Sequence, residues 1–170
     1  MDPTDIPTRF CRTVEAGDAT AFAALFTEDG VYHDVFYGEF RGRERIAAML
    51  SDWFYRDASD FRWDMHTPVF DGSTLYARYA FSFASRLAGM EGRRAMFEGV
   101  AIMTIRDGLI AAYREVANPW PGLQDLGFAP GRLEKLLARD IAALKGRPEF
   151  ARHLPNDSQS PQSSRRPHPI

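Results

Sequence analysis

The stretch TLYARYAFSFASRL, residues 74–87, alternates between two sets of side chains with the two-residue period of a β-strand. One set is large and apolar, and the other is small or polar. A strand of this kind buries one face of a sheet and leaves the other face for a different contact. The set expected in the core is Leu75, Ala77, Tyr79, Phe81 and Phe83.

Further strands are predicted on both sides of this stretch. Residues 60–70 precede it across the turn DGST, and residues 95–105 follow it after GMEGRR. The tripeptide RDG then predicts a tight hairpin into residues 109–117, after which the prolines of NPWPG end the sheet. The first strand is expected earlier in the chain, in GVYHDVFYGEF at residues 30–40.

Amphipathic segments predict helices before and after these strands. Two short helices are expected within residues 7–26, with Asp18 capping the second, and a final helix over residues 131–146. Residues 42–57 predict a helix with a single buried stripe. Helices followed by a run of strands predict the α+β class, with a curved antiparallel sheet and helices over one face. The stripe of the helix at 42–57 consists of Ile46, Met49, Leu50, Trp53 and Phe54.

Length and charge limit the class of protein. A chain of 170 residues has room for one domain, which we assign to residues 1–154. Residues 155–170 contain four prolines and four serines without an apolar period, so they predict a disordered tail. A net charge of −2, without a basic run in the folded part, argues against a nucleic-acid partner. No apolar run reaches membrane-spanning length and no signal sequence is visible, so a cytoplasmic protein without membrane binding is expected.

Motifs for metals and cofactors are missing from the sequence. The four histidines are scattered, with no HxH, HxxxH or CxxC spacing, and there is neither a phosphate loop nor a dinucleotide fingerprint. We therefore expect chemistry without a metal or other cofactor. The single cysteine, Cys11, is predicted to be a small core residue of the first helix.

A first candidate for proton transfer is the aspartate of the first strand. The strand period puts Tyr32, Asp34 and Phe36 on one face of residues 30–40 and His33 on the other. A carboxylate among apolar groups has a raised pKa and can exchange protons near neutral pH. The alternative is that Asp34 caps a turn or pairs with an arginine, the nearest being Arg41, Arg43 and Arg45.

A second carboxylate, Glu115, shares a face with Tyr113, and the same period adds Leu109 and Ala111 to that face. Two carboxylates in unlike surroundings can serve as acid and base, while buried phenols can donate to a developing oxyanion. An ion pair with a buried arginine is the alternative for Glu115. The predicted catalytic set is Asp34, Glu115, Tyr32 and Tyr79.

Large side chains on the same faces are predicted to line a substrate site. His66 falls on the polar phase with Arg62 and Asp64, so a bulge would be needed to turn it inward, where it could act as an acid or base. It is kept as a candidate. The predicted substrate-binding residues are Phe36, Trp53, Trp63, Phe81, Phe83, Phe97, Met103, Tyr113 and His66.

The opposite face of the sheet is smooth and largely apolar, which predicts a homodimer contact. A cross-strand ion pair between Arg78 and Glu98 is expected on this face. The other residues of its phase are Ala80, Ser82, Ala84, Val100 and Ile102.

The run GDATAFAALFTEDGVYHD…GEFRGRERIAAML…DGLIAAYREVAN resembles the nuclear transport factor 2-like superfamily, in particular its SnoaL-like branch, over about residues 5–120. The resemblance implies a cone-shaped fold, in which a curved antiparallel sheet with N-terminal helices packed over its concave face encloses an apolar pocket. The family includes isomerases, dehydratases, cyclases, epoxide hydrolases and non-catalytic binders, so the fold alone leaves the reaction open.

The resemblance also extends to single residues. Tyr32 and Asp34 match catalytic positions of limonene epoxide hydrolase and ketosteroid isomerase, and Glu115 matches the general base of the former. Tyr79 and Phe81 stand where that hydrolase has an arginine and an acid, which argues against epoxide opening. Scytalone dehydratase, another relative, uses histidines as acid–base groups, as suggested for His66.

The residues and the resemblance together imply a cofactor-independent lyase or isomerase that acts on a small, apolar, aromatic substrate. Dehydration, retro-aldol-type cleavage and a double-bond shift need the same groups and stay open. The alternative is a non-catalytic module that binds a small ligand or forms a dimeric interaction surface. An epoxide hydrolase-like enzyme is the third possibility.

Overall fold

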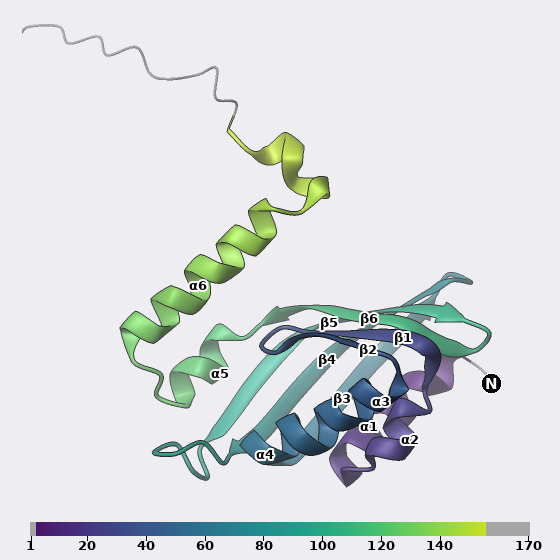
Figure 1. The fold of residues 1–170 in the computed structure, drawn as a ribbon, viewed down its shortest axis with the longest axis horizontal. Helices are drawn as coiled ribbons and strands as arrows, with labels where there is room; N and C mark the ends of the chain where they lie inside the picture. The colour runs from purple at the N-terminus through teal and green to yellow at the C-terminus, as the bar shows by residue number, and fades with distance from the viewer. Residues whose placement is uncertain (1–2, 156–170) are drawn as a thin grey trace, which may run out of the picture. The chain divides into compact units, whose positions relative to one another are not determined.

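The structure, a computed structural model, describes residues 3–155 of the chain. These residues form two compact units that divide between Phe128 and Ala129. In the first unit, helices cover one face of a single sheet, which confirms the predicted α+β class (Figure 1). The assignment of residues 1–154 to one domain stays a prediction. The predicted disordered tail lies, after Pro155, outside the described residues.

Two helices open the first unit, as predicted. A 3₁₀ turn (Pro3–Asp5) leads into α1 (Ile6–Ala16), which ends at Gly17 with a left-handed φ of 67°. Asp18 begins α2 (Ala19–Ala23) by accepting a hydrogen bond from the Ala21 amide. The apolar stripe of α1 is buried and includes Cys11, so the core role predicted for this cysteine is confirmed.

The helix predicted over residues 42–57 is built from three consecutive segments. They are α3 (Arg43–Ala48), the π-helical turn η2 (Met49–Phe54) and α4 (Tyr55–Asp57). The predicted stripe is buried except at Trp53, which is 36% exposed. The π-helical turn changes the angular spacing of side chains, so a fixed period of 3.6 residues misplaces Trp53.

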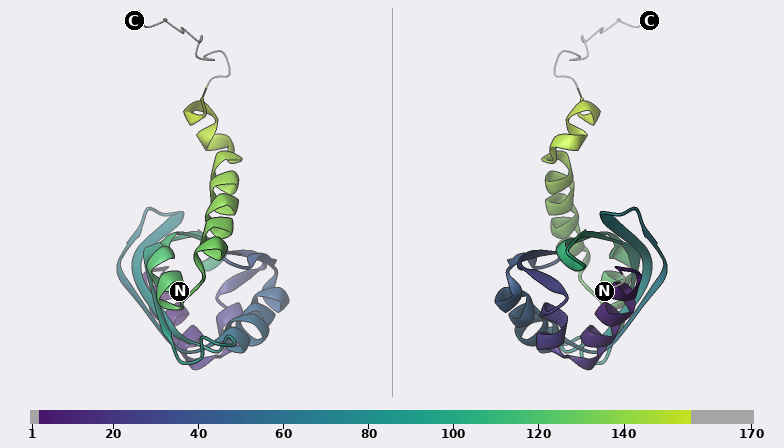
Figure 2. Two further views of the ribbon diagram at one scale, coloured as in Figure 1. Left: turned by 90° about the vertical axis from the view of Figure 1, so that its left-hand side faces the viewer. Right: turned by 90° about the vertical axis from the view of Figure 1, so that its right-hand side faces the viewer.

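The strands form one sheet in the order β2-β1-β6-β5-β4-β3. From β3 to β6 all neighbours are antiparallel, as predicted, whereas β1 lies parallel to β6. Figures 1 and 2 show that the sheet curves around the side on which α1–α4 pack. The strand bounds are β1 (Phe26–Asp34), β2 (Gly38–Arg41), β3 (Ala58–Phe70), β4 (Thr74–Ser85), β5 (Arg94–Arg106) and β6 (Leu109–Asn118).

The single strand predicted over residues 30–40 is wrong, because this stretch is a hairpin. β1 ends at Asp34, residues 35–37 turn, and β2 returns antiparallel from Gly38. The Asp34 carboxylate accepts hydrogen bonds of 2.8 Å from the amides of Phe36 and Tyr37, which fixes the turn. Phe36 therefore belongs to a turn, and the strand period does not determine its direction.

A bulge in β6 corrects a second prediction. The register passes from Thr104 opposite Ala112 to Ile105 opposite Ile110, so Ala111 is an extra residue in β6. Ile110 is fully buried, whereas Leu109 and Ala111 are only half-buried. The prediction that the face of Tyr113 continues through Leu109 and Ala111 is wrong, since a two-residue period cannot anticipate the inserted residue.

The core lies between the N-terminal helices and the inner face of the sheet. Phe10 of α1 is at its centre, with ring centroids 4.9 Å from Phe22, 5.1 Å from Trp63 and 5.1 Å from Tyr113. Along β4 and β5 the buried residues follow the predicted alternation. These are Leu75, Ala77, Tyr79, Ser85, Ala95, Phe97, Ala101 and Met103.

The outer face of the sheet also follows the predicted alternation. Arg78 and Glu98 pair there across β4 and β5 with 3.9 Å between nitrogen and oxygen. Tyr76, Val100 and Val116 are exposed beside this pair. The homodimer contact expected on this face stays a prediction.

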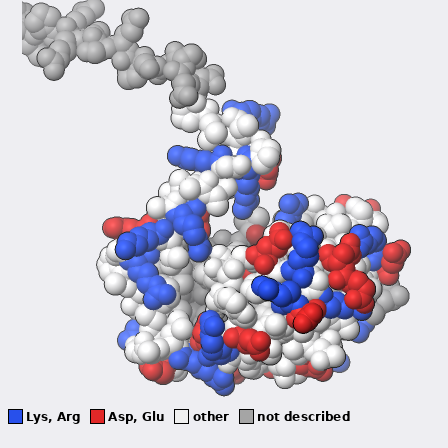
Figure 3. Space-filling view, viewed as in Figure 1, with Lys and Arg blue, Asp and Glu red and all other residues white. Residues whose placement is uncertain are grey.

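Acidic and basic side chains of the first unit are interspersed on the face shown in Figure 3. None of the helices in residues 3–155 is long and apolar enough to cross a membrane.

Short helices follow the sheet. α5 (Trp120–Asp125) stands where NPWPG predicts only a break, and Gly122 packs so closely on Phe97 that a Cβ atom would lie 2.5 Å from its ring. In the second unit, α6 (Pro130–Lys145) matches the helix predicted over residues 131–146, and a 3₁₀ turn (Pro148–His153) follows it.

Replacement of Phe10 by alanine tests the central packing. Because the ring is fully buried among aromatic neighbours, Phe10→Ala should lower the free energy of unfolding by about 3–5 kcal/mol in urea denaturation. The exposed Arg12 of the same helix gives the control, since Arg12→Ala should change stability by less than about 0.5 kcal/mol. Similar losses in both variants would contradict a core centred on Phe10.

Candidate active site

Five polar side chains from three strands lie together on the inner face of the sheet. The parallel register places Tyr32 of β1 beside Tyr113 of β6, with ring centroids 4.5 Å apart and planes at 17°. Asp34 follows Tyr32 by two residues in β1, and Glu115 follows Tyr113 by two residues in β6, close enough for the charge of Asp34 to act on Glu115. Tyr79 approaches Glu115 from β4. These five residues, Tyr32, Asp34, Tyr79, Tyr113 and Glu115, are called the inner cluster.

Glu115 receives hydrogen bonds from phenols. The Tyr113 hydroxyl donates to its Oε2 at 3.1 Å, and the Tyr79 hydroxyl is a second partner. Loss of solvent around the carboxyl raises the pKa of Glu115 to about 7; the nearby charge of Asp34 adds to this rise, and the two phenols oppose it. Glu115 can therefore take up or release a proton near neutral pH.

The tyrosines of the inner cluster remain proton donors at neutral pH. Burial, followed by the negative charge of Glu115, raises the pKa of Tyr79, Tyr113 and Tyr32 above the usual range. Tyr113 is also a hydrogen-bond partner of Tyr32, so the phenols of β1 and β6 connect to the same carboxyl group.

Gly99 of β5 makes room for the Tyr79 hydroxyl. It pairs directly with Tyr79 in the sheet, and a Cβ atom on Gly99 would lie 2.6 Å from the Tyr79 oxygen. The same Cβ would lie 2.5 Å from the carbonyl oxygen of Val116. A side chain at this position is therefore incompatible with the observed path of Tyr79 toward Glu115.

Asp34 combines a structural contact with a perturbed pKa. Desolvation raises the pKa of its carboxyl, while the amides of Tyr37 and Phe36 oppose the rise. The turn-capping alternative for Asp34 is thus observed, but the arginine alternative is not, since Arg41 pairs with Glu39 and Arg43 with Glu28. Among residues 3–155, neither Asp34 nor Glu115 takes part in an ion pair.

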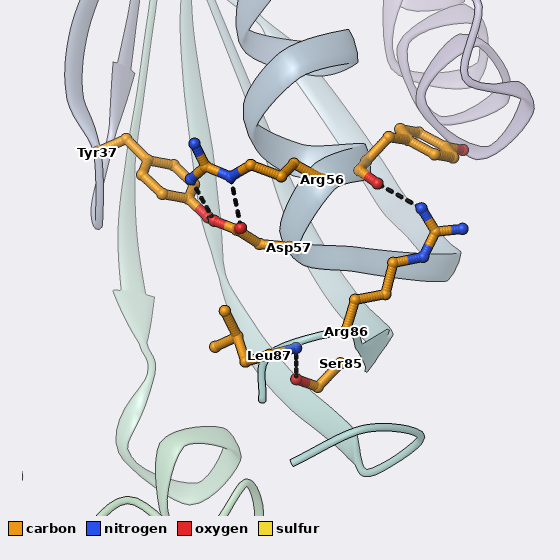
Figure 4. A network of polar contacts seen from close by, with 7 residues as sticks. Tyr37, Arg56, Asp57, Ser85, Arg86 and Leu87 are labelled. Atoms are coloured by element: carbon orange, nitrogen blue, oxygen red, sulfur yellow. Dashed lines mark hydrogen bonds and ion pairs between the residues drawn. The ribbon is translucent and has the colours of Figure 1, made fainter. Parts of the chain in front are cut away.

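A polar anchor fixes the turn that carries Asp34 and Phe36. The Tyr37 hydroxyl donates to Asp57 Oδ2 at 2.7 Å, and Arg56 binds both carboxylate oxygens of Asp57 at 2.7 Å (Figure 4). The arginine holds the pKa of Asp57 below its usual range. Arg86, which follows β4, donates to the backbone carbonyl of Tyr55, so α4 is held by hydrogen bonds to two neighbouring segments.

Aromatic rings extend from the inner cluster along β3, β4 and β5 and include one ring from the turn after β1. Trp63 lies 4.4 Å from Phe81, Phe81 lies 5.8 Å from Phe83, and Phe97 lies 5.8 Å from Phe36, as ring-centroid distances. Phe36, Phe81 and Phe83 are only half-buried, so solvent reaches this part of the inner face. We call the five residues Phe36, Trp63, Phe81, Phe83 and Phe97 the aromatic wall.

The structure brings together most of the predicted site residues. Met103 is fully buried on β5 beside Tyr113, and the aromatic wall holds five more of the predicted binding residues. Trp53 is not among them, because its ring packs on Tyr37 and Phe40.

His66 requires a correction. It is exposed opposite Arg78 on the outer face. The two irregularities in β3, between Ser59 and Arg62 and between His66 and Val69, do not turn it inward.

Two residues that position the candidate site, Gly99 and Tyr37, are not predicted from the sequence. Gly99 interrupts the apolar alternation of its strand, which is a usable signal for close approach of a neighbour. Tyr37 carries no such signal, because its partner Asp57 is brought to it only by the tertiary fold. No group of three or more potential metal ligands occurs in the described part of the chain.

Comparisons with known proteins agree with this architecture. The family model described as SnoaL-like domain matches residues 8–113. Comparison with curated protein sequences gave no match.

Among solved structures, a protein from Catenulispora acidiphila with a ketosteroid isomerase-like fold, in complex with trimethylamine, is 16% identical at a TM-score of 0.66, over 74% of this chain and 94% of its own. An LEH-like epoxide hydrolase of M. tuberculosis is 19% identical at a TM-score of 0.60, over 82% of this chain and 96% of its own. IdmH of Streptomyces antibioticus, a proposed polyketide cyclase, is 19% identical at a TM-score of 0.59, over 75% of this chain and its full length. These likenesses support the fold.

The pH dependence of stability tests the raised pKa of Glu115. The folded state holds this proton up to about pH 7, whereas the unfolded chain releases it near 4.5. The protonated Glu115 therefore stabilises the folded state fully below the unfolded-state pKa of 4.5, and this stabilisation is lost as pH rises through the folded-state pKa of about 7. Relative to Glu115→Gln, the wild type should lose up to roughly 3 kcal/mol of unfolding free energy across this window in urea denaturation. Glu98→Gln on the outer face is the control, and a pH-independent difference between wild type and Glu115→Gln would contradict the assignment.

A second prediction concerns Gly99. Gly99→Ala should displace the Tyr79 hydroxyl, which raises the pKa of Glu115 above 7 and lowers stability by roughly 1–3 kcal/mol. Carbon-13 NMR titration of the glutamate carboxyls and urea denaturation measure the two effects. Gly131→Ala is the matched control, because no atom lies within 4 Å of the added Cβ. Unchanged titration in Gly99→Ala would show that Tyr79 does not depend on this glycine.

Proposed function

Because the chain belongs to the SnoaL-like domain family, and because its inner face holds a proton-exchanging carboxyl among phenols, we propose that it is a cofactor-independent lyase or isomerase. Its substrate would be a small, largely apolar, aromatic molecule. The observation that carries the proposal is the environment of Glu115. Its carboxyl group has a pKa of about 7, is hydrogen-bonded by two tyrosines and forms no ion pair among the described residues.

The reaction would begin with proton abstraction. The ionised Glu115 takes a proton from a carbon next to a substrate carbonyl, and the electron pair moves onto the carbonyl oxygen. Once Glu115 has taken the proton, its carboxyl no longer needs the Tyr79 hydroxyl as a donor, so that hydroxyl can donate a hydrogen bond to the developing enolate, while Tyr32 supports the arrangement through Tyr113. Return of the proton to another carbon gives an isomer. Its transfer to a departing hydroxyl gives water and a new double bond.

Asp34 provides the second carboxyl of the proposal. Its surroundings differ from those of Glu115, because it accepts backbone amide hydrogen bonds and Glu115 accepts phenolic ones. Groups in unlike surroundings can hold their protons over different pH ranges and so divide acid and base roles. The aromatic wall would hold the substrate ring beside them.

Deuterium exchange tests the proposal without knowledge of the natural substrate. The wild type is incubated in deuterated buffer with small aryl ketones, and loss of the proton beside the carbonyl is followed by NMR. We expect exchange that rises with pH through about 7, persists with chelator, and falls roughly 100- to 10,000-fold in Glu115→Gln. Glu98→Gln on the outer face should keep the wild-type rate. Exchange that needs a metal, or that survives in Glu115→Gln, would refute the proposed mechanism.

The alternatives have less support. A binding module would tie its carboxylates into ion pairs, and neither carboxyl of the inner cluster is paired in residues 3–155. Ligand binding without exchange would nevertheless favour that reading. Epoxide opening of the limonene epoxide hydrolase type would need a cationic group beside Glu115, where this chain has Tyr79.

A further inference from the structure

The indole nitrogen of Trp63 is a buried donor without a partner. Trp63 is 4% exposed, and its Nε1 is the single buried side-chain nitrogen or oxygen without a hydrogen bond in the described part of the chain. Its backbone amide, in contrast, donates to Glu15 Oε1 at 2.7 Å. The strand is thus fixed to α1 at this residue while the side-chain donor is left unused.

Trp63 lies at the boundary between the closed core and the part of the inner face that solvent reaches. On one side the ring of Trp63 contacts Phe10, which is fully buried, at a centroid distance of 5.1 Å. On another side it contacts Phe81, which is half-buried, at a centroid distance of 4.4 Å. Tyr79 of the inner cluster is 5.7 Å away on the neighbouring strand. The indole ring is therefore in contact with the ring of Tyr79, whose hydroxyl is a hydrogen-bond partner of Glu115.

An unused donor at this boundary needs a physical reason. Buried tryptophan N–H groups usually find an acceptor, because leaving them unpaired opposes folding. A phenylalanine would supply an aromatic contact here without that cost. The aromatic rings in contact with Trp63 are Phe10, Tyr79 and Phe81, and an ionised ligand group among such rings would lose its hydration. The missing partner is then expected to be a neutral acceptor oxygen.

We propose that the indole N–H of Trp63 is the hydrogen-bond donor for a carbonyl or hydroxyl oxygen of the ligand. The inference rests on the proposed function and narrows its substrate class to oxygenated aromatic molecules with a neutral acceptor at the Trp63 end. Trp63 is a specificity residue in this assignment, distinct from the proton-transferring carboxyls. The N–H selects against hydrocarbons of the same shape, because these would leave it unpaired.

Two probes of similar shape test the assignment on the full wild-type chain. Acetophenone carries an acceptor oxygen, and ethylbenzene does not. The nitrogen-15 indole signals are assigned with Trp53→Phe and Trp120→Phe, which leave Trp63 intact. We expect acetophenone to shift the Trp63 indole proton downfield beyond the ring-current effect seen with ethylbenzene. It should also bind roughly 5- to 100-fold more tightly.

The outcomes separate this inference from the proposed function. In Trp63→Phe the preference for the ketone should disappear; if that variant does not fold, the wild-type indole signal decides alone. Ketone binding with an unmoved Trp63 signal, or a ketone preference that persists in Trp63→Phe, would overturn the inference and leave the acid–base proposal standing. Failure of both probes to bind would overturn the inference together with the proposed aromatic substrate.

Discussion

The parallel contact between β1 and β6 is the constraint on which the inner cluster depends. It stacks Tyr32 on Tyr113, and the charge of Asp34, two residues further along β1, acts on Glu115. A parallel pair cannot be closed by a tight turn, so the chain must pass through α3 and the strands β3 to β5 before it returns. The two carboxyls therefore meet only when the whole first unit is folded, and Phe10 from α1 packs against the stacked tyrosines.

The chemistry of Glu115 follows from the kind of partner it has. An arginine would hold the carboxylate ionised and lower its pKa, whereas phenols compensate only part of the lost hydration. With Tyr79 and Tyr113 as its partners, Glu115 thus keeps a pKa of about 7. Gly99 has no side chain, and this leaves space for the Tyr79 hydroxyl that a Cβ atom would occupy. The Asp34 carboxyl, in contrast, is hydrogen-bonded by backbone amides of the turn that follows it.

Alternation along β4 and β5 predicted the inner face correctly, because two-residue periodicity is a direct consequence of strand geometry. It failed where the backbone departs from that geometry. Ala111 is inserted in β6 and residues 35–37 form a turn, while the helical period failed at Trp53, which lies within the π-helical η2. The pairing of β1 with β6 and the Tyr37–Asp57 contact are tertiary, so no local pattern encodes them. The candidate carboxyls and tyrosines were predicted, whereas Gly99 and the Tyr37–Asp57 contact, which position them, were not.

The inner face divides into a closed end and an end that solvent reaches, and its polar groups lie between the two. Phe10, Phe22 and Phe26 are fully buried at the closed end, and Phe36, Phe81 and Phe83 are half-buried at the other. A carboxyl placed deeper would be unable to exchange its proton with water, and one placed further out would keep the pKa of a solvated acid. The boundary is the position at which burial raises the pKa of Glu115 and the proton can still leave. Burial of the carboxyls of the inner cluster lowers the free energy of unfolding, and the aromatic packing at the closed end compensates for this loss.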